Sequence, residues 1–151
     1  MKVKEVMVKE VDSLSPDISV KEAMDILLKR KISGLPVIDK SGKLAGMFTE
    51  KSILSYLLPS YIENVGRFVY EENPKATKKK LSELCRIKVS QLMRKEVVTT
   101  TEETALCEAA RIMLTQKVRR LPVVDKQGRI IGIIAREDIL RAMGKEACCA
   151  I

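Results

Sequence analysis

Apolar residues recur with a helical period early in the chain. The stripe consists of Val20, Ala23, Met24, Leu27 and Leu28. Positions i, i+3, i+4, i+7 and i+8 lie on one face of an α-helix. Ser19 and Glu22 stand in the S-x-x-E spacing of a capping box, in which each side chain binds backbone at the helix start. The pattern predicts an amphipathic helix of about three turns that begins at Ser19.

A different period follows this helix. Two apolar runs, 35–38 and 43–48, are separated by a polar turn that contains Gly42. Short apolar runs joined by a glycine-containing turn predict a β-hairpin. Residues 50–57 then predict a second helix, and residues 11–14 predict a short strand ahead of the first helix. The expected order is β-α-β-β-α.

The same order is written a second time, 86 residues later. Pro36 pairs with Pro122 at this offset without a gap, and 19 of the 52 pairs between 3–54 and 89–140 are identical. The second copy predicts a leading strand at 97–100, a hairpin, and a last helix at 136–143. Its first helix is expected to begin near Thr104. The apolar stripe of that helix consists of Leu106, Ala109, Ala110, Met113 and Leu114.

One copy of this length buries too little surface to fold stably on its own. We therefore expect an α+β fold in which two tandem β-α-β-β-α units pack sheet to sheet about a pseudo-twofold axis. The predicted boundaries are 1–58 for the first repeat and 88–145 for the second. Residues 59–87 are expected to form a helical and basic connector, and residues 146–151 a flexible tail.

The connector differs from both repeats in composition. It holds Tyr61, Phe68 and Tyr70, which with Tyr56 are most of the aromatic residues, and a lysine run at 78–80. We expect a helical hairpin or lid with a solvated basic end, continuing into a helix around 81–85.

Composition limits the compartment and the chemistry. Hydrophobic residues make up 46% of the chain and aromatic residues 3%, so the core must be aliphatic. No apolar run is long enough to span a bilayer, and the first residues lack the apolar region of a signal peptide. The chain has four cysteines and no histidine, which argues against a metal site and favours free thiols. We expect a soluble, cytoplasmic protein with no membrane partner.

Charge favours anionic partners and leaves two classes of function open. The formal net charge is +8, which attracts nucleotides, nucleic acid or acidic protein. The sequence shows no recognition helix, zinc finger or aromatic stacking motif, so nucleic acid is possible but not favoured. It also shows no phosphate-binding Walker loop and no nucleophile elbow. An enzyme is the least favoured class.

The repeated residues carry a family resemblance. Leu-Pro-Val-Ile/Val-Asp, a glycine three residues later, a second glycine four residues beyond it and a following Ile-Leu occur in both copies. This pattern resembles the CBS domain, and two copies in one chain resemble a CBS pair, or Bateman module. The resemblance implies two quasi-equivalent sites in a cleft between the repeats. It also implies regulatory ligands such as AMP, ADP, ATP or S-adenosylmethionine, no obligatory cofactor, no catalysis, and a homodimer.

The family's ligand signature, Gly-hydrophobic-x-Thr/Ser-x-x-Asp, is split between the two copies. The first copy keeps the hydroxyl of Thr49 but has Ser52 in the place of the carboxylate. The second copy keeps the carboxylate of Asp138 but has Ala135 in the place of the hydroxyl. A carboxylate can accept hydrogen bonds from both ribose hydroxyls, and a hydroxyl near helix N–H groups can receive phosphate oxygens. The Asp138 site is therefore favoured for ribose recognition.

The resemblance also implies that each site combines a signature from one copy with backbone from the other. The first predicted site consists of Asp138, Ala135, Arg136, Ile32, Ser33 and Gly34. The second consists of Thr49, Lys51, Ser52, Val118, Arg119 and Arg120. The second site is the candidate for a polyphosphate, because its two arginines could face the phosphate oxygens.

Each of these residues also has a purely structural interpretation. Thr49 and Asp138 both suit the start of a helix, where they would cap backbone N–H groups or complement the helix dipole. Ser33 is also an ordinary turn residue, and Arg119 and Arg120 are also consistent with a solvated charge pair. Few residues follow the last predicted helix, so the unknown regulated protein is expected to be a separate chain.

Overall fold

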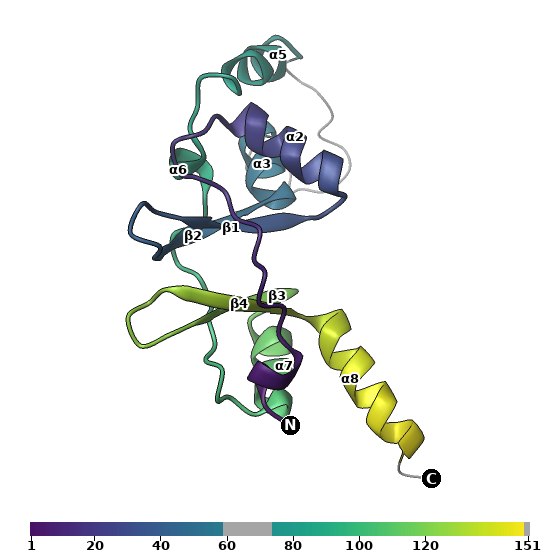
Figure 1. Cartoon of the computed structure of the whole chain (residues 1–151). Coiled ribbons are helices and arrows are strands. Elements are labelled where there is room, and N and C mark those ends of the chain that lie inside the picture. The colour runs from purple at the N-terminus through teal and green to yellow at the C-terminus, as the bar shows by residue number, and fades with distance from the viewer. Residues whose placement is uncertain (59–73, 150–151) are drawn as a thin grey trace. The chain divides into compact units, whose positions relative to one another are not determined.

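The computed structural model describes residues 1–58 and 74–149 of the 151-residue chain (Figure 1). The described chain divides into two compact units. Unit 1 consists of Met1–Asp12, Lys40–Leu44 and Glu96–Ile151, and unit 2 of Ser13–Asp39 and Ala45–Lys95. Both units mix helices with one small two-stranded sheet, so the predicted α+β class is confirmed.

Unit 2 contains the elements of the first repeat. The elements are α2 (Val20–Arg30), β1 (Gly34–Ile38), β2 (Leu44–Thr49) and α3 (Glu50–Leu57). Figure 1 shows α2 and α3 on the same side of the β1–β2 sheet. Ser19 caps α2, because its hydroxyl oxygen accepts a hydrogen bond from Glu22 N–H at 3.1 Å, which is one of the two bonds of the predicted capping box. The core contains Leu14, Val20, Ala23, Leu27, Leu35, Val37, Phe48, Ile53, Leu84 and Val89.

Unit 1 contains the elements of the second repeat. The elements are α7 (Leu106–Thr115), β3 (Arg120–Val124), β4 (Ile130–Ala135) and α8 (Arg136–Cys149). β3 and β4 pair antiparallel, with Arg120 opposite Ala135 and Leu121 opposite Ile134. The helix before this hairpin begins at Leu106, two residues after the position expected from the sequence. The core contains Val3, Leu106, Ala109, Met113, Leu121, Val123, Ile134 and Ile139.

The packed units and the sequence repeats have different boundaries. The first residues of the chain, with α1 (Val3–Val6), belong to unit 1, where Val3 is fully buried. The first residues of the second repeat, with α6 (Val89–Leu92), belong to unit 2, where Val89 is fully buried. The first residues of each repeat thus complete the unit that holds the other repeat's hairpin. The predicted repeat boundaries stay a description of the sequence.

The predicted leading strands are wrong. Each is reduced to one parallel bridge residue, Leu14 against Val37 and Thr100 against Val123. In the first copy, Met1–Asp12 belongs to unit 1, where Val8 pairs with Ile133. Residues 13–15 are then left in unit 2 before the turn at Pro16, and of these Leu14 pairs with β1.

Two further expectations need correction. The helix of the connector is α5 (Pro74–Glu83), which contains the lysine run and ends before Leu84 enters the core. Residues 59–73, with Tyr61, Phe68 and Tyr70, lie outside the described residues, so the predicted hairpin or lid stays a prediction. The last helix continues past 143 to Cys149, into the segment expected to be a flexible tail. In the described residues, no helix is both long and apolar enough to cross a membrane.

Candidate functional site

Thr49 and Ser52 lie at the N-terminus of α3 and cap it. Thr49 Oγ1 accepts from Ser52 N–H at 3.4 Å, and Thr49 N–H donates to Ser52 Oγ at 3.3 Å. The two hydroxyl oxygens are 3.4 Å apart, and both residues are half-buried. These distances are at the long end of the hydrogen-bond range. The structural interpretation of Thr49 is therefore confirmed, and its weak contacts leave the hydroxyl available to a better acceptor.

The backbone before β1 lies beside this cap. Glu50 N–H donates to the Ser33 carbonyl at 2.9 Å. Gly34 faces Thr49 so closely that an added Cβ would lie 2.7 Å from Thr49 Cγ2. Ile32 is half-buried, and Lys51 is exposed on the first turn of α3. Within unit 2, the structure thus brings residues 32–34 and 49–52 together.

Asp138 occupies the same place in unit 1. Its Oδ2 accepts from Ala135 N–H at 2.8 Å, and its Oδ1 lies 3.4 Å from Arg141 Nη1. The side chain is 14% exposed. This is a shorter, charge-assisted version of the cap that the two hydroxyls form in unit 2. The cap role of Asp138 is confirmed, and among the described residues the contact of Oδ1 is a long one to an exposed arginine.

The backbone before β3 repeats the arrangement found before β1. Arg136 N–H donates to the Arg119 carbonyl at 3.1 Å, the equivalent of the bond from Glu50 to Ser33. Arg120 is half-buried and has a partner, whereas the Arg119 side chain is exposed. Val118 is half-buried. Within unit 1, residues 118–120 and 135–138 therefore lie together. The pairing of each signature with the other repeat's backbone stays a prediction.

Arg136 has a structural contact that the sequence did not indicate. Its Nε–H donates to the Val118 carbonyl at 3.2 Å, and Nη2 donates to the Met113 carbonyl at 3.3 Å. The guanidinium therefore binds the C-terminal end of α7 and complements the negative end of that helix. This contact competes with the predicted membership of Arg136 in the Asp138 ligand site.

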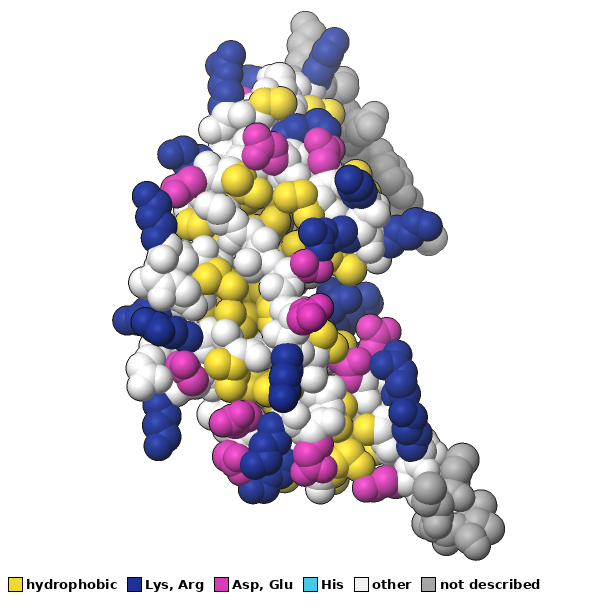
Figure 2. Space-filling view, in the orientation of Figure 1, with side chains coloured by type: hydrophobic (Ala, Val, Ile, Leu, Met, Phe, Trp, Pro, Cys, Tyr) yellow, Lys and Arg dark blue, Asp and Glu magenta, His cyan; other side chains and the backbone are white. Residues whose placement is uncertain are grey.

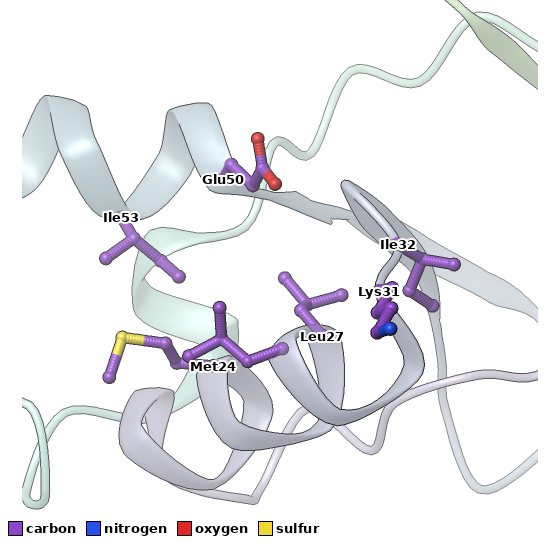
Figure 3. Close-up of a pocket in the computed structure, with 7 residues that line it drawn as sticks. Met24, Leu27, Lys31, Ile32, Glu50 and Ile53 are labelled. Carbon is purple, nitrogen blue, oxygen red and sulfur yellow. The ribbon is translucent and has the colours of Figure 1, made fainter.

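A groove in unit 2 also escaped the sequence analysis. It lies between α2 and α3, has a volume of about 310 Å³, and is drawn in Figure 3. Its lining residues are Met24, Leu27, Leu28, Lys31, Ile32, Glu50 and Ile53. The signal that could have found it is the pair Glu50 and Arg136, which stand at equivalent positions and carry opposite charges.

Other charged contacts lie away from these half-sites. Glu103 accepts hydrogen bonds from Lys2 Nζ at 2.5 Å and Lys4 Nζ at 2.6 Å, and these bonds lower the pKa of Glu103 to about 2. Tyr56 O–H donates to Glu83 at 2.6 Å, which raises the pKa of the Tyr56 phenol. Lys80 of the basic run lies over the Tyr56 ring, 5.5 Å from its centre. These contacts fasten α5 to α3 and the first residues to unit 1.

Sequence comparison places both repeats in one family. The CBS domain family matches residues 3–59 and 89–145. An inosine-5'-monophosphate dehydrogenase from Methanocaldococcus jannaschii is 35% identical over 140 residues, which are 93% of this chain and 23% of that enzyme. This likeness therefore concerns less than a quarter of the enzyme.

Structure comparison agrees. CBSX2 from Arabidopsis thaliana, a CBS-pair protein solved in complex with AMP, is 30% identical and has a TM-score of 0.75. The match covers 97% of this chain and 98% of CBSX2. The CBS domain pair of MJ0100, solved with 5'-methylthioadenosine and S-adenosyl-L-methionine, is 27% identical with a TM-score of 0.69, over 97% of this chain and 98% of that one. The chain belongs to the CBS domain family and carries a pair of these domains.

Proposed function

We propose that this CBS pair is a non-catalytic regulatory module. It binds an adenosine nucleotide or S-adenosylmethionine in the cleft between its repeats and signals to a separate partner protein. The observation that carries the proposal is the Asp138 carboxylate, which stands in the signature position at the start of α8 with Oδ1 weakly engaged. The AMP complex of CBSX2 and the S-adenosyl-L-methionine complex of MJ0100 support this class of ligand.

The Asp138 signature and residues 32–34 form the favoured site on this proposal. The second site, with Thr49, Lys51, Ser52 and residues 118–120, is proposed for a polyphosphate. The exposed side chains of Lys51 and Arg119 supply positive charge for it. We propose that the adenosine compound acts as a ligand, and that it is neither a substrate nor an obligatory cofactor.

Thermal unfolding tests the ligand. The protein is unfolded with saturating AMP, ADP, ATP, S-adenosylmethionine or GTP in parallel samples. A ligand at about 100 times its Kd stabilises the folded state by roughly 2.7 kcal/mol, which raises the Tm of a chain of this length by roughly 5–10 °C. An adenosine compound is expected to give this shift and GTP is not. No shift with any adenosine compound contradicts the proposal.

Two substitutions at one position locate the site. Asp138→Ala removes the carboxylate and the cap of α8, whereas Asp138→Asn keeps an oxygen that can accept from Ala135 N–H. Both are expected to weaken binding several-fold, and only the alanine variant should lose stability without ligand. Unchanged affinity in a folded Asp138→Asn variant would move the site elsewhere, and the same measurement on Thr49→Ala reports on the second site.

A nucleic-acid function has less support. Lys78 and Lys79 are exposed on α5, but Lys80 lies over the Tyr56 ring. On the face shown in Figure 2, Lys and Arg side chains are interspersed with Asp and Glu and form no continuous basic patch. Binding of single-stranded RNA that weakens steeply with added salt, together with no nucleotide binding, would favour this alternative.

The proposed module is a homodimer. Leu54 on α3 is 54% exposed, and its equivalent Leu140 on α8 is 71% exposed. Leucines exposed at matching positions of two repeats suggest a surface that a second copy covers. Sedimentation should give twice the chain mass, and Leu54→Glu combined with Leu140→Glu should reduce it to one chain. A monomeric unaltered protein would contradict this part of the proposal.

We also propose that the protein is cytoplasmic, which fractionation of cells can test.

A further inference from the structure

The second strand of each hairpin pairs with a residue from the start of the other repeat. In unit 1, Val8 N–H donates to the Ile133 carbonyl at 2.9 Å, and Ile133 N–H donates to the Val8 carbonyl at 2.9 Å. In unit 2, Arg94 N–H donates to the Met47 carbonyl at 2.8 Å, and Met47 N–H donates to the Arg94 carbonyl at 2.9 Å. Two backbone hydrogen bonds thus hold each starting segment on β4 or β2.

A methionine precedes each paired residue and covers a glycine of the same strand. A Cβ on Gly132 would lie 2.7 Å from Met7 Sδ, and a Cβ on Gly46 would lie 2.8 Å from Met93 Sδ. Both methionines are half-buried, and each packs against the core of its unit. Each sulfur atom therefore lies at a place that is open only because the strand residue is glycine. The unbranched, polarizable side chain of methionine suits such a place.

The two glycines are the first residues of the two ligand signatures. Gly132 lies on β4, six residues before Asp138, and Gly46 lies on β2, three residues before Thr49. The sulfur contacts are therefore made to the strands that lead directly into the half-sites.

We propose that Met7 and Met93 are sites of reversible oxidation by peroxides, and that their oxidation releases the starting segments from the hairpins. The sulfur atom forms a bond to one oxygen of hydrogen peroxide, and the O–O bond breaks. Sulfur loses two electrons and becomes the sulfoxide. The departing hydroxide takes the proton of the transferred oxygen and leaves as water.

A sulfoxide does not fit where these sulfur atoms lie. Oxidation makes an apolar side chain polar and chiral, and a buried polar oxygen without a hydrogen-bond donor is costly. The glycine backbone lies on one side of each sulfur and the core of the unit on another. The side chain is therefore expected to leave its place and to open the two backbone hydrogen bonds of the next residue. A weaker affinity for adenosine compounds should follow, and this last step alone rests on the proposed function.

Graded treatment of the full chain with hydrogen peroxide tests the reactivity. Mass spectrometry of its peptides measures the oxidised fraction of each methionine. Met143 is 38% exposed on α8 and Met113 is 1% exposed in the core of unit 1, so they mark the fast and slow limits. Met7 and Met93 are expected to react between these limits, and a methionine sulfoxide reductase should restore them. Oxidation only together with Met113 would overturn the inference, as would sulfoxides that the reductase leaves in place.

Amide hydrogen exchange on the same samples tests the release. Ile133 N–H and Met47 N–H donate to the segments that carry the two methionines. Both amides should exchange at least about tenfold faster after Met7 and Met93 are oxidised, because local opening exposes them to water. Oxidation of Met143 alone should leave their exchange unchanged. Unchanged exchange in protein with both sulfoxides would overturn the inference.

Substitutions separate the polarity of the sulfoxide from other effects of peroxide. Met7→Gln combined with Met93→Gln should accelerate exchange of the two amides without peroxide, whereas Met143→Gln should not. Met7→Leu combined with Met93→Leu keeps both side chains apolar and should make the exchange insensitive to peroxide. Norleucine in place of every methionine keeps the unbranched shape and replaces this variant if leucine does not fold. Peroxide-sensitive exchange in the leucine or norleucine protein contradicts the assignment.

Thermal unfolding with AMP keeps the inference distinct from the proposed function. The AMP-dependent rise in Tm is expected in the reduced protein and should fall as Met7 and Met93 are oxidised. An absent AMP response in the reduced protein contradicts the proposed ligand only, because mass spectrometry and hydrogen exchange decide oxidation and release without any ligand. A full AMP response in protein whose segments are released overturns the expected effect on ligand affinity.

Discussion

The two repeats share a backbone and differ at the helix that follows each hairpin. In the turn after the first helix of each repeat, Lys31 and Lys117 both have a φ of 55°, and the turn glycines Gly42 and Gly128 have φ values of 82° and 79°. Glu50 N–H and Arg136 N–H bond equivalent carbonyls at 2.9 and 3.1 Å. The two repeats, with 19 identities in 52 positions, thus reach the same geometry, and the identical residues include the turn glycines and buried residues such as Ala23 and Leu35.

The repeats differ at four consecutive positions where that helix begins, 49–52 against 135–138. In unit 2, two neutral hydroxyls cap α3 over distances of 3.3–3.4 Å, and in unit 1 a carboxylate caps α8 at 2.8 Å. The residue after Thr49 is Glu50, which lines the groove between α2 and α3. The residue after Ala135 is Arg136, whose side chain donates a hydrogen bond to the Val118 carbonyl at the equivalent place in unit 1. Glu50 and Arg136 are exposed and belong to neither core.

The largest expected effect comes from a glycine that both repeats share. A Cβ at Gly46 would lie 2.7 Å from the Arg94 carbonyl oxygen, whereas at Gly132 the first contact is the flexible Met7 Sδ at 2.7 Å and the nearest backbone atom is 3.1 Å away. Gly46→Ala should therefore lower the free energy of unfolding by about 1–3 kcal/mol, and Gly132→Ala by less. Urea denaturation of both variants measures the difference. Equal losses would show that the backbone at Arg94 moves aside as easily as the Met7 side chain.

A buried hydroxyl gives the next largest effect. Thr100 is 5% exposed, and its Oγ1 has no hydrogen-bond partner in the described residues, while the equivalent residue of the first repeat is the buried Leu14. Thr100→Val keeps the shape and removes an unsatisfied polar group, so we expect a gain of about 1 kcal/mol. Thr100→Ser keeps the hydroxyl and loses a methyl group, and should destabilise the protein. A loss of stability in Thr100→Val would reveal a partner for the hydroxyl.

Exchanging the caps tests the signature directly. Ser52→Asp gives the first repeat the carboxylate that Asp138 supplies in the second. A carboxylate at the start of a helix stabilises it by about 0.3–1 kcal/mol. The same carboxylate should increase the AMP-dependent shift in Tm by completing the Thr-x-x-Asp signature after Thr49. Ser52→Asn is the neutral control. A Ser52→Asp variant that gains stability but no AMP response would show that the carboxylate serves only the helix.

Sequence periodicity was sufficient for the helices and hairpins. Ser19, the apolar stripes and the turn glycines determine local structure, and α2, α3 and both hairpins were predicted from them. The leading strands failed because their alternation is too short to show whether a residue pairs with one hairpin or crosses to another unit. Val3 and Val89 carry no local signal that they complete the core of a unit built around the other repeat.

The candidate site was only partly visible in the sequence. Thr49 and Asp138 were identified from the signature, and their alternative role as caps was predicted from their place before a helix. The bonds from Arg136 to the Met113 and Val118 carbonyls depend on how α7 ends, which is a tertiary contact. The groove depends on the absence of such a contact in unit 2. The available signal was the opposite charge of Glu50 and Arg136 at equivalent positions. It can be interpreted only when the position of the helix ends is known.

The smallest effect concerns an ion-pair cluster that only unit 1 possesses. Glu103 bonds Lys2 and Lys4, whereas the equivalent positions in unit 2 hold Asp17, Lys88 and Ser90. These bonds lower the pKa of Glu103 from 4.5 to about 2. A carboxyl group with a lowered pKa in the folded state stabilises the fold above pH 4.5 and loses that contribution as the pH falls toward 2. All three side chains are close to half exposed, so solvent and salt reduce the effect.

Glu103→Gln should therefore have slightly lower stability than the unaltered protein at pH 7, and the difference should shrink between pH 4.5 and pH 2. Asp17→Asn is the matched control in unit 2, where no equivalent ion pair is present among the described residues. Its stability at neutral pH should change less. Urea denaturation at pH 7 and pH 3, in low and high salt, measures both variants. A salt-independent loss in Glu103→Gln would mean that this side chain fastens the first residues by packing and not by charge, because only a Coulombic contribution is screened by added ions.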